Sequence, residues 1–76
     1  MLAEIGRELV ERQCLYTFSV EGTALFVAIM PGYRDCSHMP TKELRDIMLE
    51  VAKKHGFRGV SYSKIYFAKI AIYFTE

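Results

Sequence analysis

The stretch from Ile65 to Phe74 constrains the fold most, because it is apolar on both faces of a predicted strand. Side chains alternate between the two faces of a strand. One face would carry Ile65, Phe67, Lys69, Ala71 and Tyr73, and the other Tyr66, Ala68, Ile70, Ile72 and Phe74. Since neither face is polar, we expect both to need cover.

The first part of the chain predicts a helix followed by two paired strands. Apolar residues at helical spacing predict an amphipathic helix over residues 2–12. Period-two alternation over residues 14–20 predicts a first strand. The dipeptide Glu21-Gly22 has the length of a hairpin loop, and the apolar run that follows Thr23 predicts a second, antiparallel strand.

The second part repeats this order. Thr41 is a predicted N-cap, Glu43 places an acid in the first turn, and Gly56 follows a cationic last turn, which together bound a second helix. A short strand is predicted over residues 57–62 and a tight turn at Ser63-Lys64, before the terminal strand. The element order is therefore α-β-β-α-β-β, a single α+β domain over residues 1–76 with a four-stranded, mainly antiparallel sheet packed against two helices.

The chain is short for a self-sufficient core. With 76 residues it should bury only about 60% of its unfolded surface, so an additional stabilising feature is expected. Two cysteines without a CxxC pair do not predict a disulfide framework or a zinc site. Two short helices cannot readily cover both faces of the sheet, and we favour both on one face, with an aromatic surface left for another chain.

These features favour a small, non-catalytic protein-interaction module that self-associates, as a homodimer for example, or docks on a larger protein as an inhibitor or adaptor. The contact would use the sheet or the 31–40 loop. Aromatic side chains carry much of the energy of protein interfaces. The predicted contact residues are Tyr16, Phe18, Tyr33, Tyr66, Ile70 and Tyr73.

A second hypothesis is binding of single-stranded nucleic acid, RNA in particular, by the C-terminal half. Residues 41–76 contain seven basic and four acidic side chains, whereas residues 1–40 contain three basic and five acidic ones. Aromatic side chains on a sheet can stack bases while neighbouring cations meet phosphates. The candidate residues are Lys53, Lys54, Arg58, Tyr62, Lys64 and Lys69, with Tyr66 and Tyr73 as further aromatic platforms.

A third hypothesis places thiol or metal chemistry in the loop over residues 31–40, where Asp35, Cys36 and His38 lie close in sequence. A metal there would recruit Cys14 or His55 as a further ligand. The spacing matches no known catalytic or metal-binding pattern, and the sequence contains no phosphate-binding glycine loop, HExxH motif or nucleophile elbow. We therefore expect no enzyme activity, no cofactor and no bound metal.

The longest apolar run covers residues 24–30, far short of the roughly 20 residues that a membrane-spanning helix needs. The N-terminal residues carry acids within their apolar stretch, which is unlike a secretory signal. From these features we expect a cytoplasmic protein with reduced thiols and no membrane partner.

Overall fold

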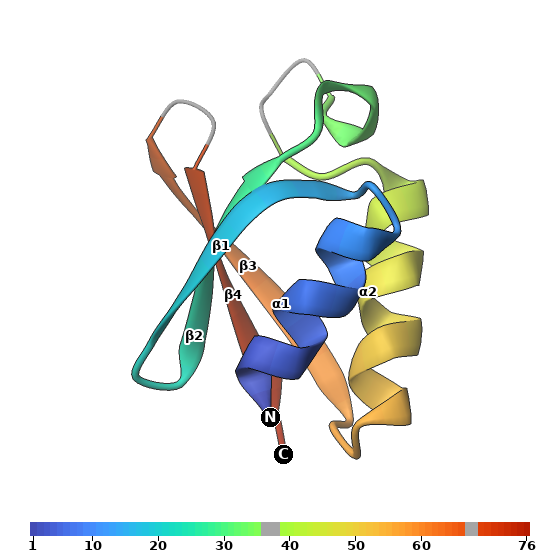
Figure 1. Ribbon diagram of the computed structural model, residues 1–76, viewed down its shortest axis with the longest axis vertical. Coiled ribbons are helices and arrows are strands. Elements are labelled where there is room, and N and C mark those ends of the chain that lie inside the picture. The colour runs from blue at the N-terminus through green and yellow to red at the C-terminus, as the bar shows by residue number, and fades with distance from the viewer. Residues whose placement is uncertain (36–38, 67–68) are drawn as a thin grey trace.

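The computed structural model describes residues 1–35, 39–66 and 69–76, except for the side chain of Tyr66. Its described part has the predicted α+β order, with a short 3-10 helix before the second α-helix (Figure 1). The elements are α1 (Leu2–Glu11), β1 (Leu15–Glu21), β2 (Ala24–Ile29), η1 (Pro31–Tyr33), α2 (Lys42–Lys54), β3 (Gly59–Tyr66) and β4 (Lys69–Thr75).

The four strands form one sheet in the order β1-β2-β4-β3, and every neighbouring pair is antiparallel. The terminal strand β4 is therefore central, between β2 and β3. Because both of its neighbours run antiparallel to it, β2 and β3 run parallel to each other, and α2 makes the crossover between them. This placement pairs β4 on both sides and leaves β1 and β3 as the edges.

Both helices lie on one face of the sheet, the arrangement favoured from the sequence (Figure 1). α1 packs on β1 and α2 on β3, and the two helices also contact each other. Branched side chains of the two central strands point into this layer. The core contains Ile5 and Leu9 of α1, Leu44, Met48 and Val51 of α2, Leu25, Val27 and Ile29 of β2, and Ile70 and Ile72 of β4.

The predicted ends of α2 are confirmed. The hydroxyl of Thr41 accepts a hydrogen bond from the backbone N–H of Leu44 at 3.3 Å, which satisfies one of the free donors of the first turn. Lys53 and Lys54 occupy the last turn, and Gly56 follows with φ of 93°, a conformation that glycine adopts without strain.

The predicted turn at Ser63-Lys64 is wrong. Both residues lie inside β3, where Ser63 pairs with Ala71 and Lys64 with Ile70. β3 begins at Gly59 and ends at Tyr66, and β4 begins at Lys69. Polar residues are tolerated here because β3 is an edge strand. The stretch lacks the Gly, Asn, Asp or Pro that normally marks a hairpin turn, so its position was not readable from turn residues.

α1 approaches β1 closely at Gly6, which is buried. A Cβ added at this position would lie 2.5 Å from Cδ2 of the Phe18 ring, well inside contact distance. Glycine costs a helix about 1 kcal/mol relative to alanine. The Phe18 ring explains why glycine occupies this position, because it leaves no room for a Cβ. The absent side chain lets Phe18 fill the space between helix and sheet.

We predict that Gly6→Ala lowers the free energy of unfolding by about 1–3 kcal/mol, because overpacking against the ring outweighs the gain in helix propensity. In a Phe18→Ala background the same substitution should stabilise the protein by about 0.5–1 kcal/mol. Urea unfolding of the four proteins in this double-mutant cycle measures both effects. Gly32→Ala, with no atom within 4 Å of the added Cβ, is the control. A neutral Gly6→Ala in the otherwise unchanged protein would contradict this packing.

Candidate interaction surface

The sheet face opposite the helices, which we call the open face, has no other element packed on it in the described part of the chain (Figure 1). Strand register and alternation define its side chains. They are Thr17, Ser19 and Glu21 of β1, Ala24, Phe26 and Ala28 of β2, Ser61 and Ser63 of β3, and Lys69, Ala71, Tyr73 and Thr75 of β4.

Small side chains surround two aromatic rings on this face. Phe26 of β2 pairs with Ser19 on one side and with Ala71 on the other. Tyr73 pairs with Ala24 and is 43% exposed, whereas Ala71 is buried by its neighbours at 2% exposure. The open face is therefore less apolar than predicted for the terminal strand, because Ile65 lies in β3 and small side chains surround the two rings.

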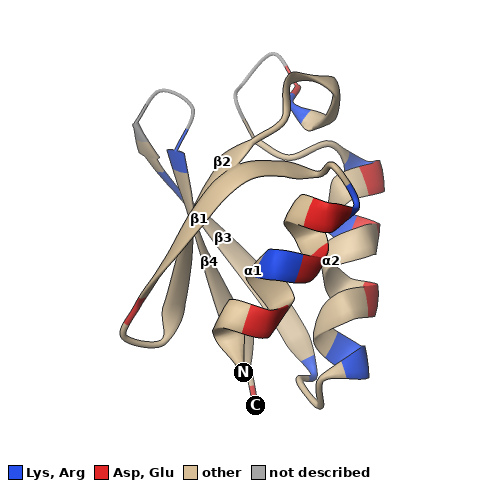
Figure 2. Ribbon diagram, viewed as in Figure 1, with Lys and Arg blue, Asp and Glu red and all other residues tan. Residues whose placement is uncertain are grey.

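Charge is almost absent from the sheet (Figure 2). The chain has ten basic and nine acidic side chains, and of these only Glu21, Lys64 and Lys69 lie within strands. Both Glu21, at the end of the edge strand β1, and Lys69, at the start of the central strand β4, are on the open face. Depletion of charged residues marks the core of protein–protein interfaces, so the composition of this face suits contact with another protein surface.

The two sheet edges are less suited to pairing with another strand. In β1, Tyr16 is the extra residue of a bulge between Leu15 and Thr17, and in β3 Ile65 is the extra residue between Lys64 and Tyr66. The bulges lie at the same end of the sheet. Lys64 adds an exposed charge on the helix side of β3. Bulges and inward-pointing lysines are features that prevent edge-to-edge association.

The structure places the six predicted contact residues in different environments. Tyr73 lies on the open face, and Tyr16 is 63% exposed at the β1 edge. Phe18 and Ile70 belong to the layer under the helices, and Tyr33 is partly buried against the same core. The side chain of Tyr66 lies outside the described residues. Sequence reasoning missed Phe26, although the alternation of Ala24, Phe26 and Ala28 with branched residues in β2 carried the signal.

The six nucleic-acid candidates do not share one surface. Lys54 donates a hydrogen bond to Glu8 of α1 at 3.2 Å, and the Arg58 side chain donates to the backbone carbonyl of Glu76 at 2.8 Å. The remaining four are spread over the molecule. Lys53 is exposed at the end of α2, Tyr62 and Lys64 are on the helix side of β3, and Lys69 is on the open face.

Glu8 is the centre of a charged cluster between the two helices. Its carboxylate lies 3.2 Å from Lys54 Nζ, 3.2 Å from Arg12 and 3.6 Å from Nε2 of His55. The hydrogen bond from Lys54 lowers the pKa of Glu8, and the charge of Arg12 acts in the same direction. His55 therefore belongs to an interhelical contact at the end of α2.

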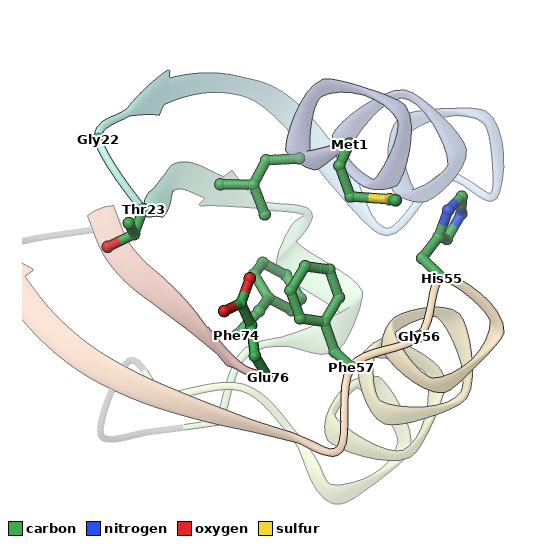
Figure 3. Close-up of a pocket in the computed structure, with 9 residues that line it drawn as sticks. Met1, Gly22, Thr23, His55, Gly56, Phe57, Phe74 and Glu76 are labelled. Carbon is green, nitrogen blue, oxygen red and sulfur yellow. The ribbon is translucent and has the colours of Figure 1, made fainter.

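An apolar hollow of about 720 Å³ lies at the end of the core layer, beside that cluster (Figure 3). Its walls include Phe57 and Phe74, whose ring centroids are 5.4 Å apart at 42°. Met1 and His55 also face it. The hollow is on the helix side of the sheet and is separate from the open face.

The hypothesis of thiol or metal chemistry rests on Cys36 and His38, which lie outside the described residues. Cys14 is free and fully buried at the start of β1, and burial raises the pKa of its thiol. The Tyr33 side chain is its neighbour. In residues 1–35, 39–66 and 69–76, no three His, Cys, Asp or Glu side chains are grouped so that they could hold a metal ion.

Comparisons with protein-family models, with curated proteins and with solved structures found no match to this chain. Among the described residues, neither helix has the length and apolar character needed to cross a membrane.

Tyr62 supplies a test of its position under α2, because burial raises its pKa to about 12 from the usual 10. The folded protein then keeps a proton that the unfolded chain loses, so the free energy of unfolding should fall as pH rises from 10 to 12. Tyr62→Phe should remove this part of the fall, measured by urea unfolding at each pH. Tyr73→Phe, on the open face, should leave it in place. An unchanged slope in Tyr62→Phe would contradict the buried position.

Proposed function

We propose that the protein is a non-catalytic interaction module that self-associates through the open face of its sheet. The observation that carries the proposal is the composition of this face. Among the described residues no other element covers this face, two aromatic rings lie among small side chains, and the only charged side chains, Glu21 and Lys69, are of opposite sign.

A second copy of the same chain is the occupant that this composition favours. A symmetric dimer brings identical patches together, so the patch must be complementary to itself. A face with many like charges would repel its copy, whereas a neutral face with one acid and one base does not. The short, exposed side chains of Thr17, Ser19 and Ser61 also let two sheets approach closely, as in face-to-face sheet packing.

The short chain gives a further reason for association. A domain of 76 residues has a small core, and oligomerisation is one of the usual ways in which such domains gain stability. Because the bulges disfavour strand pairing at both edges of the sheet, we expect association through the open face and not by strand addition. Docking on a larger protein, as an inhibitor or adaptor, would use the same surface.

The buried free thiol of Cys14 suits the reducing cytoplasm, where we place this function.

Sedimentation equilibrium from about 1 to 500 μM tests the proposal. We expect reversible self-association, and we expect Tyr73→Lys to weaken it about tenfold or more, because it places like charges on both copies of the face. Val20→Lys is a matched control, since Val20 is 44% exposed against 43% for Tyr73 but lies on the helix side of β1.

Far-UV circular dichroism and urea unfolding establish that both variants remain folded. Two results would contradict the proposal. One is a monomer over the whole concentration range. The other is an association that Val20→Lys weakens and Tyr73→Lys does not.

A further inference from the structure

The open face carries two diagonals that cross at Phe26. Glu21 pairs with Ala24 across the β1-β2 ladder, and Lys69 pairs with Ala28 across the β2-β4 ladder. Phe26 is midway between those two alanines along β2. Glu21 is therefore one strand away from Phe26 and two residues along the sheet. Lys69 is displaced by the same amount in the opposite direction.

The second diagonal is aromatic. Tyr73 lies on β4 and pairs with Ala24, so the line from Phe26 to Tyr73 runs across the line from Glu21 to Lys69. With about 4.8 Å between strands and about 3.3 Å between residues, each charged residue lies roughly 8 Å from Phe26. The two diagonals cross at roughly 70°, so reflection across the aromatic diagonal carries the position of Glu21 to within roughly 5 Å of the position of Lys69.

We propose that two copies meet face to face about a two-fold axis that follows the Phe26–Tyr73 diagonal, so that Glu21 of each copy pairs with Lys69 of the other. This inference rests on the proposed function and adds its register. A rotation of 180° about that line exchanges the two sides of the face. It therefore brings the acid of one copy within roughly 5 Å, measured along the sheet, of the base of the other, twice per dimer, and the long side chains of Glu21 and Lys69 span the remaining distance.

Phe26 then lies at the centre of the contact, with Tyr73 further along the axis and one ion pair on either side of it. Both Phe26 and Tyr73 lie along this axis, so each faces its own copy in the partner. Aromatic anchors near the centre of an interface contribute most to affinity, whereas charges at the rim mainly set orientation. Half-turns about the strand direction, or about a line across the strands, leave Glu21 roughly 10 Å or more from Lys69, so the two ion pairs favour an axis near the aromatic diagonal.

The size of the face sets the expected affinity. Four strands at about 4.8 Å and about six residues at 3.3 Å give a projected area of roughly 400 Å² per copy. Two such areas total about 800 Å², below the roughly 1,200 Å² at which stable interfaces begin, so we expect a weak, transient dimer with a dissociation constant of roughly 100 μM. The experiment must therefore cover protein concentrations from about 1 to 500 μM.

Charge reversal tests the register. Glu21→Lys places two positive charges together at each rim contact, and Lys69→Glu places two negative ones, so each single variant should dimerise about tenfold more weakly. An equimolar mixture of the two variants should recover association as a heterodimer, because both rim contacts are then between opposite charges. The double variant Glu21→Lys, Lys69→Glu should recover association as a homodimer.

The matched controls are Glu11→Lys and Lys53→Glu, which make the same changes of charge on the exposed surfaces of α1 and α2. Neither should weaken the dimer, and mixing them should give no added association. Sedimentation velocity at low salt measures all of these species, and added salt should reduce the effect of each reversal on the open face.

Three results would overturn the inference. If the single variants dimerise normally while Tyr73→Lys does not, the face is used in another register and the proposed function stands. The same holds if the single variants weaken but neither the mixture nor the double variant recovers. If the unchanged protein is monomeric throughout, the proposed function fails and the register fails with it.

Discussion

The pairs Leu25–Ile72 and Val27–Ile70 in the two central strands determine how the rest of the molecule is arranged. Their branched side chains are almost fully buried under both helices. Because side chains alternate along a strand, burying these residues places Phe26, Ala71 and Tyr73 on the opposite face. Both helices are needed for the core, and in the described residues no third element covers that opposite face. The open face is thus a consequence of the way the core is formed.

The sequence predicted most of this arrangement, because the elements carry strong local signals. Thr41 and Gly56 bound α2, and Gly22, with φ of 61°, lies in the predicted first hairpin. The second hairpin was misplaced. Ser63 and Lys64 read as a turn by residue type, yet in an edge strand a serine can face outward and a lysine can reach solvent from the helix side. Only pairing with Ala71 and Ile70 across the ladder fixes their place.

The candidate site was predicted less well, because residue type does not reveal which face of a strand is covered. Choosing aromatic and large apolar residues selected Tyr73, which lies on the open face, together with Phe18 and Ile70, which lie in the layer under the helices. Phe26 was missed because its strand is apolar throughout, and only the contrast between alanines and branched residues in β2 marks its face. The basic residues of the C-terminal half were grouped by sequence, whereas the fold gives Lys54 and Arg58 partners inside the domain.

We propose that β2 and β4 have one face closed by the helices and the other closed by a second copy of the chain. Methyl resonances in a dilution series followed by NMR report on the two faces separately. Ala24, Ala28 and Ala71 have methyl groups on the open face, and Val27, Ile70 and Ile72 have theirs in the core. We predict that the alanine methyl shifts change with protein concentration while the core methyl shifts stay constant. Alanine shifts that do not change with concentration, or changes confined to the surfaces of α1 and α2, would contradict the account.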